Sequence, residues 1–556
     1  MTISTSNASA VARPSRADLE RRRQPTPPAP PPPATAEPPH TVWSRFIILL
    51  LCLAVVTTTL AFGTVQSWAL AVFTLSAGVV LALWMIDAWR TRVLRVSKNF
   101  LQLPLLAFFA LGVVQLLPLG GPQDLGAGLA APARTISFDP HATRLVLVEV
   151  AGLFVYFAAA LAFIDSPRRL RLVARLVVIF GFLLGVYGLM QHFLNPSTIF
   201  WIRQPEQAEP FGPYVNRHHF AGYMELTLAM PLGLLFAGAV ERDRVLLYAF
   251  ASAMMAIALV MTNSRGGMLS MVCEILFLAA VAAIFRRRGP REEGEESAGG
   301  RVRAAAIRVG LGFAMIITVF FGVLYFGGED ALSRLVGTVN SEDPTTGRAH
   351  FWEGAVQMIK DHPVVGTGLG AFGSVYPRYD TANGTYRLEQ AHNDYLQILT
   401  DGGVVAGALG LLFVVLLLRM ALRRMQSHDR VRRGVALGAL AGCAGVLVHS
   451  FFDFTLHTTA NALMFLVLAA LATADGRVEE PDEARRPARK RRSSHHHHHH
   501  YHQHHGAGRE SAERAETRAP AEQAEAGGST DAATEGARAP AEQSPAREEG
   551  QAGAGG

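Results

Sequence analysis

Long apolar runs separated by short polar segments dominate the chain between residues 46 and 474. Each run is about 17 to 25 residues long, the length that carries an α-helix across a hydrocarbon core of about 30 Å. Helices are expected because lipid offers no partner for an unpaired backbone group. We predict an all-α polytopic membrane protein with about twelve transmembrane helices, at residues 46–62, 68–86, 100–117, 145–164, 172–194, 219–239, 245–262, 267–285, 307–326, 396–418, 434–452 and 459–474.

The basic residues predict how these helices are oriented. Short loops rich in Lys and Arg stay in the cytoplasm. When the runs are threaded alternately, most basic side chains gather on one side, namely Arg90, Arg92, Arg95, Lys98, Arg168, Arg169, Arg171, Arg242, Arg244, Arg286, Arg287, Arg288, Arg419, Arg423, Arg424, Arg430, Arg432 and Arg433. We expect this side, and both termini with it, to be cytoplasmic.

The composition supports a membrane protein and gives no sign of a disulfide-rich, thiolate-metal or nucleic-acid-binding protein. Of the 556 residues, 50% are hydrophobic and only 17% are charged, which is too apolar for an ordinary soluble domain of this length. Cys52, Cys273 and Cys443 lie inside predicted spans, so neither a disulfide framework nor a thiolate metal site is implied. No nucleic-acid-binding motif accompanies the net charge of +6. The first apolar run begins only at residue 46, so we expect no cleavable signal.

Two polar tails flank a transmembrane domain that we place at residues 43–474. Residues 1–42 are rich in proline, and residues 475–556 are of low complexity and repeat "RAPAEQ", so we expect both tails to be disordered and cytoplasmic. The second tail carries "HHHHHHYHQHH" at 495–505, which resembles either a metal-binding run or a purification tag. A flexible run cannot fix a coordination geometry, so we give it no functional weight.

The longest outer loop, residues 327–395, is the only extramembrane segment large enough to have its own architecture. Within it, residues 347–363 place Trp352, Ala355 and Ile359 on one helical face, which predicts an amphipathic helix on the membrane surface or against the bundle. The alternating Gly366, Gly368 and Gly370 that follow lack the strand and helix of a dinucleotide-binding unit. We interpret these three glycines as a tight turn.

Three arginines on the outer side depart from the charge pattern. Arg217, Arg265 and Arg348 lie at membrane edges where basic residues are otherwise scarce. A guanidinium binds phosphate oxygens in a bidentate manner, so an outward-facing anionic ligand would explain them. Alternatively, each extends toward lipid head groups. Gly266 and Gly267 would let the start of a helix approach a phosphate closely.

His392 is the candidate general base. It lies in "AHNDY", at the outer edge of the span 396–418, and imidazole can take a proton from a sugar hydroxyl near neutral pH. Asn393 or Asp394 could orient it, but neighbours one or two positions apart on a helix do not face each other, so a partner from elsewhere in the chain stays open. The alternative is a plain interfacial histidine, with Asn393 or Asp394 as the cap of the helix that follows.

Two further sets of residues are weaker candidates. His449, Asp453 and His457 recur every four positions, as on one helical face at the outer end of the span 434–452. A metal site would need another ligand, so we favour a polar patch at the outer edge near the same site. A carboxylate inside a membrane span is costly and is a functional hypothesis by default. Such carboxylates are Glu149, Glu225 and Glu274.

Taken together, the motifs resemble one known family. "YVNRHHFAGYMEL", "NSRGGML", "GRAHFWEGAVQMIKDHPVVGTGLGAF", "AHNDYLQILTDGGVVAG" and "DFTLHTTANALMFLVLAAL" are similar, in this order, to the O-antigen ligase superfamily, which includes O-antigen polymerases and protein O-oligosaccharyltransferases. The resemblance covers about residues 210–472. It implies a metal-independent, cofactor-free, inverting glycosyltransferase on the periplasmic face of the bacterial inner membrane. Its implied donor is an undecaprenyl-pyrophosphate-linked glycan, and its implied acceptor is a hydroxyl of the lipid A core.

The resemblance also assigns roles to residues. It makes His392 catalytic and Arg217, Arg265 and Arg348 binders of the pyrophosphate. The other substrate-binding candidates are Asn216, His219, Asn393 and Asp394. His218 departs from the family pattern, since relatives often have asparagine there.

Three alternatives stay open. A polymerase or a protein O-oligosaccharyltransferase would differ in its acceptor rather than in its pyrophosphate site. A transporter or flippase predicts broken helices and paired charges near the bilayer midplane, whereas these motifs cluster at one edge. A non-catalytic scaffold would leave the outer arginines unexplained.

Overall fold

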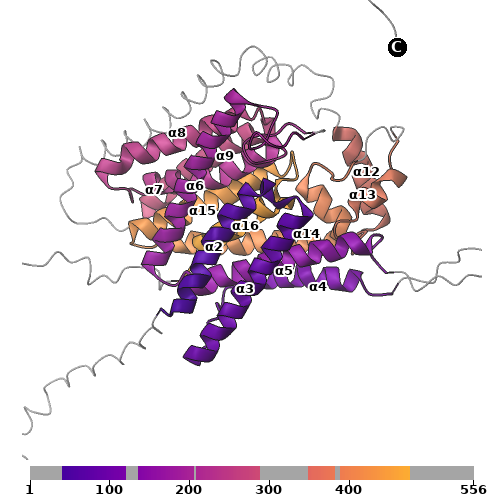
Figure 1. Ribbon diagram of the computed structural model, residues 1–556, viewed down its shortest axis with the longest axis horizontal. Coiled ribbons are helices and arrows are strands. Elements are labelled where there is room, and N and C mark those ends of the chain that lie inside the picture. Colours follow the sequence, from indigo (N-terminus) through magenta and orange to yellow (C-terminus); the bar gives the residue numbers. More distant parts are fainter. Residues whose placement is uncertain (1–39, 120–134, 206–207, 289–347, 382–387, 476–556) are drawn as a thin grey trace, which may run out of the picture. The chain divides into compact units, whose positions relative to one another are not determined.

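The computed structural model describes residues 40–119, 135–205, 208–288, 348–381 and 388–475. Every regular element in this part of the chain is helical (Figure 1). The longer helices are α2 (Val42–Leu60), α3 (Ser67–Thr91), α4 (Gln102–Gln115), α5 (Pro140–Phe163), α6 (Pro167–Leu194), α7 (Arg217–Phe236), α8 (Val245–Met261), α9 (Arg265–Arg288), α12 (Arg348–Asp361), α14 (Asp394–Arg424), α15 (Arg430–His449) and α16 (Thr459–Thr473). The short ones are η1 (Phe62–Thr64), η2 (Arg242–Arg244), α13 (Phe372–Val375), η3 (Tyr376–Arg378) and η4 (Thr455–His457).

The all-helical prediction is confirmed for these residues. Each predicted span coincides with one of these helices, except 307–326, which lies outside the described residues. By length and composition, 7 of the described helices can cross a membrane: α2, α3, α5, α6, the segment Arg242–Met261, α14 and α15. The number of twelve spans therefore stays a prediction, and so does the extent of the loop 327–395. The predicted tails, including the histidine run, lie outside the described residues except for residues 40–42 and 475. The first of these tails ends where α2 begins, at Val42.

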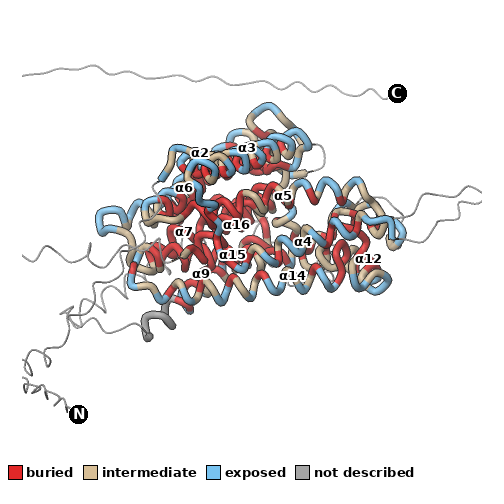
Figure 2. Tube along the Cα trace, turned by 90° about the horizontal axis from the view of Figure 1, so that it is seen from below, coloured by how far each residue is buried: buried red, intermediate tan, exposed pale blue. Residues whose placement is uncertain are grey.

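The core of the bundle is formed by α7, α15 and α16, which Figure 2 colours mostly as buried. Glycines allow α15 to approach α7 closely, because a Cβ on Gly438 would lie 2.7 Å from the carbonyl oxygen of Ala229. Gly434 and Gly442, one turn before and after, meet Leu234 and Leu226 in the same way. Small residues spaced by four are a common way of packing helices in lipid. In contrast, only 28% of the apolar window of α3 is buried, against 72% of that of α15.

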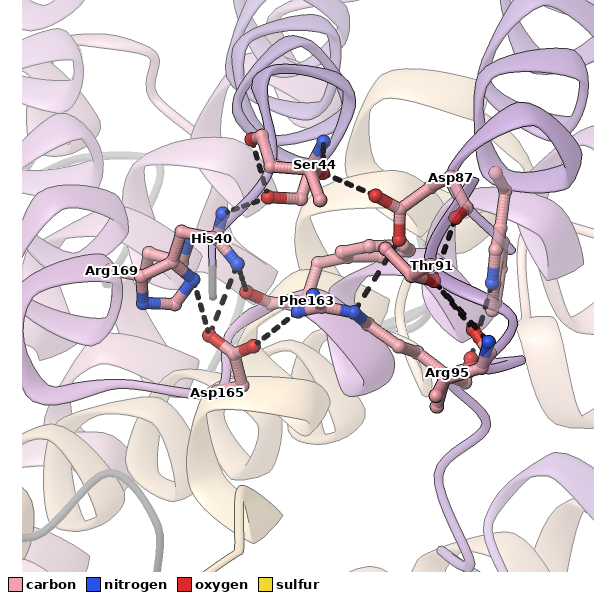
Figure 3. Close-up of polar contacts among 11 residues, drawn as sticks. His40, Ser44, Asp87, Thr91, Arg95, Phe163, Asp165 and Arg169 are labelled. Carbon is pink, nitrogen blue, oxygen red and sulfur yellow. Dashed lines mark hydrogen bonds and ion pairs between the residues drawn. The ribbon is translucent and has the colours of Figure 1, made fainter. Parts of the chain in front are cut away.

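A buried charge network closes one end of the bundle (Figure 3). Arg95 lies 3.4 Å from a carboxylate oxygen of Asp87 and 3.3 Å from one of Asp165. Arg169 donates to Asp165 at 3.1 Å and to the hydroxyl of Ser44 at 2.7 Å. These contacts join the start of α2, the end of α3 and the turn between α5 and α6. Two of the arginines that predict a cytoplasmic side are thus held by carboxylates inside the fold.

A smaller core lies at the opposite end, where α12 and α13 pack beside the start of α14 (Figure 1). The helix predicted at 347–363 is confirmed as α12. Ala355 and Met358 on its inner face are fully buried, and the Trp352 indole donates to the carbonyl of Ala391 at 3.2 Å. Of the two placements that the sequence left open, the structure therefore has the helix against the bundle.

The glycine-rich segment after α12 packs against a break in α14. Gly366, Gly368 and Gly370 all have positive φ, as expected for a turn. The turn meets α14 at Gly403, which is non-helical with φ 63°. There the amide of Val404 donates to the carbonyl of Pro363 at 2.8 Å, and Gln115 of α4 donates to the carbonyls of Val365 and Asp401. The break is therefore fully hydrogen-bonded, and it separates the first turns of α14 from the long apolar part.

Candidate functional site

The start of α14 carries the "AHNDY" motif. Asn393 is the N-cap, because its side-chain oxygen accepts from the amides of Tyr395 at 2.9 Å and Leu396 at 3.1 Å. Of the two cap candidates, the structure has Asn393 in this position. His392, just before the cap, has φ 49°, a left-handed conformation that is uncommon for a residue with a side chain. Such strained positions cluster at functional sites.

His392 faces a carboxylate from a distant part of the chain. Its Nδ1 lies 3.3 Å from Oδ1 of Asp453, and the exposed fractions of the two side chains are 28% and 1%. The ring of Phe454 packs edge-on against the imidazole, with centroids 4.8 Å apart. A buried carboxylate on Nδ1 fixes the orientation of the ring and leaves Nε2 as the nitrogen that can exchange a proton.

A second histidine lies on the other side of the same carboxylate. Nδ1 of His218 is 3.8 Å from Oδ2 of Asp453 and 2.9 Å from the hydroxyl of Ser264. Asn216 caps α7 by accepting from the amide of His218 at 2.9 Å, which is a structural role for a predicted substrate binder. His218 and His392 thus lie on either side of one buried aspartate, near the N-terminal ends of α7, α9 and α14.

His219, another predicted substrate binder, is buried beside these groups. Its Nδ1 lies 3.0 Å from the hydroxyl of Thr458, and Phe454 packs edge-on against its ring as well. Its backbone carbonyl accepts from the side-chain amide nitrogen of Asn461 at 2.9 Å. These contacts hold α7 against the start of α16, so His219 supports the wall of the site.

Asp394, one of the two neighbours that could orient His392, contacts His457 and Ser450 instead. Oδ1 of Asp394 lies 2.6 Å from Nδ1 of His457, and Oδ2 accepts from the hydroxyl of Ser450 at 2.7 Å. Burial lowers the pKa of His457, but the hydrogen bond and the charge of Asp394 outweigh it, so its pKa is raised. Asp394 therefore fixes the connection between α15 and α16, while the orienting carboxylate of His392 is Asp453.

The prediction that His449, Asp453 and His457 lie on one face of a helix is wrong. Helix α15 ends at His449, Asp453 lies in the turns that follow, and His457 belongs to η4. Each of the three faces a different ionisable partner: Glu225, His392 and Asp394. The spacing of four singles out these three residues as candidates. In the structure they form three separate pairs rather than one set of ligands.

A buried polar pair lies beneath the two histidines. Nδ1 of His449 is 2.8 Å from Oε1 of Glu225, whose other oxygen accepts from Ser270 at 2.7 Å. His449 connects to the site through Ser264, whose hydroxyl is 3.4 Å from its Nε2. The sequence identified Glu225 as a candidate but not this partner, because the two helices meet only in the fold.

The other two membrane carboxylates differ from Glu225. Glu149 accepts from the hydroxyl of Thr459 at 2.8 Å, so it joins α5 to α16. Glu274 is buried, and neither of its carboxylate oxygens has a hydrogen-bond partner among the described residues. Gly445 leaves room for it, since a Cβ there would lie 3.0 Å from Oε2.

The predicted arginines differ in their surroundings. Arg265 begins α9 half-buried, and within the described ranges no hydrogen bond or ion pair engages its side chain. Arg217 pairs with Glu209, whose side chain is 69% exposed. Arg348 begins α12, and its side chain lies outside the described part of the structure. Of the three predicted arginines, Arg265 directly follows Ser264, which contacts His218, and it has no described carboxylate partner.

Gly266 and Gly267 pack closely against other helices. A Cβ on Gly266 would lie 2.9 Å from His449, and one on Gly267 would lie 3.0 Å from Ala221. These glycines allow α9 to approach α15 and α7. Their role in letting a phosphate approach the start of α9 stays a prediction.

A cavity of about 330 Å³ opens next to these groups. Arg217, Glu209, His192, Gln204 and Asn263 line it, together with the ring of Phe211. His192 stacks on Phe211 with ring centroids 5.2 Å apart. Polar side chains around a flat ring suit the alternating polar and apolar faces of a sugar.

Comparisons with known proteins agree with the motifs. A family model described as O-antigen ligase matches residues 250–411, which span α8, α9, α12 and the broken first part of α14. The matched range contains Arg265, Arg348 and His392, whereas Arg217 and Asp453 lie outside it. No curated protein matches the chain. Over residues 250–411, the family match confirms the resemblance to the O-antigen ligase superfamily that the motifs carry.

Proposed function

We propose that this chain transfers a glycan from undecaprenyl pyrophosphate to an acceptor hydroxyl at the periplasmic face, with the lipid A core as the acceptor. The family match supports glycosyltransferase activity of the O-antigen ligase type in general. The donor, the acceptor and the independence from metal are our inference. The observation that carries the proposal is the pairing of His392 with the buried Asp453 at 3.3 Å.

His392 acts as the general base in this mechanism. With Nδ1 directed at Asp453, Nε2 takes the proton of the acceptor hydroxyl as that oxygen attacks the anomeric carbon. The new glycosidic C–O bond forms while the bond between the anomeric carbon and the pyrophosphate oxygen breaks. The attack comes from the side opposite the leaving group, so the anomeric configuration inverts. Asp453 stabilises the imidazolium that results.

The arginines hold the leaving group. Pyrophosphate departs readily once its charge is balanced, and fixed guanidinium groups supply that balance without a metal. Arg265 is the first contact in this proposal. Arg217 joins when the pyrophosphate replaces Glu209, and Arg348 is a third candidate from the start of α12.

The transporter alternative has two features of the structure in its favour. Helix α14 breaks at Gly403, and Glu225 pairs with His449 inside the bundle. The break, however, is closed by hydrogen bonds from the segment 363–368, and the buried pair connects through Ser264 to the two histidines. The family match also favours the transferase.

The direct test is transfer by the purified full chain in liposomes that contain a polyprenyl-pyrophosphate-linked glycan and a lipid A core acceptor. We expect His392→Ala to abolish transfer and Arg265→Ala to raise the KM for the donor about tenfold or more. His141→Ala is the matched control, because His141 is exposed on the first turn of α5 at the same end of the bundle. Full transfer by His392→Ala would remove the mechanism.

A deletion strain identifies the acceptor. Loss of capped lipopolysaccharide is expected for a ligase, loss of long chains alone would indicate a polymerase, and loss of glycosylated protein would indicate a protein O-oligosaccharyltransferase. These three readouts differ although the proposed pyrophosphate site is the same.

A further inference from the structure

The end of the bundle opposite His392 contains a second cavity, of about 310 Å³. It forms where the first turns of α6, the segment after α7, the start of α8 and the start of α15 meet. Its charged lining consists of three arginines and one glutamate: Arg171, Arg175, Arg244 and Glu241. The cavity therefore has an excess of positive charge, and none of these residues belongs to the proposed transfer site.

Three guanidinium groups line this one cavity. Arg171 and Arg175 are one turn apart on α6, so their side chains lie on the same face of the helix. Arg244 lines the cavity from the start of α8 and lies 3.3 Å from Glu241 and 3.8 Å from Asp243, all three side chains being exposed. Tyr248, one turn after Arg244, adds a hydroxyl to the lining. Arginines together with a hydroxyl match the oxygens of a phosphate.

The position of Arg175 points to a lipid as the source of that phosphate. Helix α6 has 28 residues, whereas about 20 cross the hydrocarbon core. The last 20 residues, ending at Leu194, begin at Arg175, which puts this arginine at the depth of the head groups. Arg175 is exposed on the same stripe of α6 as Leu172 and Ile179, which are 52% and 57% exposed. The cavity thus borders an apolar surface that faces acyl chains.

The floor and the flank of the cavity are apolar. Ala174, Leu234 and Val435 are buried at its base. Leu246 and Leu247, just after Arg244, are 80% and 61% exposed. Charged groups above an apolar wall fit a molecule that has a phosphate at one end and hydrocarbon at the other.

We propose that this cavity binds the phosphate head group of an anionic phospholipid. A zwitterionic lipid carries its own cation, which the three arginines repel, so the site favours lipids with a net negative charge. Basic pockets between helices at the cytoplasmic side are suited to such lipids. The inference is independent of the proposed glycosyl transfer, because it rests only on residues at the other end of the bundle.

The test measures how much lipid stays bound to the detergent-purified full chain, by native mass spectrometry, during titration with phosphatidylglycerol or phosphatidylcholine. We expect phosphatidylglycerol to bind about tenfold more tightly, and the double variant Arg171→Gln/Arg175→Gln to lose that difference. The matched control is Arg419→Gln/Arg423→Gln, an exposed pair with the same spacing near the end of α14 and outside the cavity. It should keep the tenfold preference.

Three results would overturn the proposal. Equal binding of the two lipids, or an equal loss in the control pair, would mean that no defined site exists. Displacement of phosphatidylglycerol by millimolar inorganic phosphate would indicate a site for free anions instead. If the double variant does not fold, Arg244→Gln tests the third arginine of the cavity, and an unchanged preference there also contradicts the proposal.

Discussion

Asp453 is the residue on which the geometry of the candidate site depends. It is 1% exposed, and its two carboxylate oxygens face His392 and His218. A buried carboxylate needs partners, since isolation from water would otherwise make its charge very costly. The backbone amide of Phe454 donates to Oδ1 of Asp453 at 2.9 Å, and the imidazoles of His392 and His218 lie 3.3 and 3.8 Å from its oxygens.

We predict that Asp453→Asn lowers the turnover of glycan transfer by about a hundredfold or more, while the protein still folds. An amide cannot stabilise the imidazolium of His392, and general acid–base catalysis is worth about 10²- to 10⁴-fold. The measurement is kcat in the liposome assay. Asp380→Asn is the control, because Asp380 pairs with His350 at 3.0 Å in the neighbouring segment but does not contact His392. Undiminished turnover of Asp453→Asn would show that His392 needs no carboxylate.

The pair of His457 and Asp394 predicts a pH-dependent stability. The pKa of His457 is raised above its ordinary value of 6.5, so the folded state binds the proton more tightly than the unfolded state does. Its contribution to stability is therefore complete below about pH 6.5 and is lost as the pH rises through the folded pKa. We expect His457→Gln to lower the melting temperature in detergent more at pH 5.5 than at pH 8.5. A larger gap at the higher pH would contradict the ion pair.

At the scale of elements, the sequence predicts the helices well and their contacts poorly. Apolar runs identify α2 to α9 and α14 to α16 because lipid demands a helix wherever a long apolar segment crosses it. The pair Gly402 and Gly403 is a local signal for the break of α14. The packing of the segment after α12 against this break depends on tertiary contacts, which the local sequence does not show. The sequence singles out His392 and Arg265 as candidates because reactive side chains at a membrane edge are unusual. The pairing of His392 with Asp453 was missed because it joins two connections that are distant in the chain.

The contact between α7 and α15 predicts the cost of adding a single methyl group. In Gly438→Ala, the new Cβ would lie 2.7 Å from a backbone oxygen and 2.9 Å from the Cα of Met230, so a helix must move. We expect a loss of about 1–3 kcal/mol in the free energy of unfolding. Gly78→Ala on α3 is the control, because nothing lies within 4 Å of the Cβ position there. Its stability should not fall, and a gain of up to about 1 kcal/mol is expected because alanine is favoured over glycine inside a helix. Equal effects of the two variants, measured as melting temperatures in detergent, would rule out the close contact.

At the scale of the whole molecule, two polar ends are separated by apolar helix. Helix α2 starts at the network of Asp87, Arg95 and Arg169. The turn after α2 reaches the end of the bundle that carries the histidines, where a Cβ on Gly63 would lie 2.9 Å from Thr458. The 19 residues of α2 span about 28 Å, close to the thickness of the hydrocarbon core. The arginine-rich end and the histidine-rich end would then lie on opposite faces of the membrane, as both the transfer mechanism and the lipid cavity require.

Labelling of single cysteines tests this orientation. In a chain whose Cys52, Cys273 and Cys443 are replaced by alanine, we expect His141→Cys near the candidate site to react with a membrane-impermeant maleimide added to cells with a permeabilised outer membrane. His428→Cys, exposed between α14 and α15, should react only after the inner membrane is opened. Both positions are exposed, so a difference in labelling reports the side of the membrane rather than burial. The reverse pattern would place His392 and Asp453 in the cytoplasm, where a periplasmic acceptor could not reach them, and would also move the arginine-lined cavity to the outer leaflet.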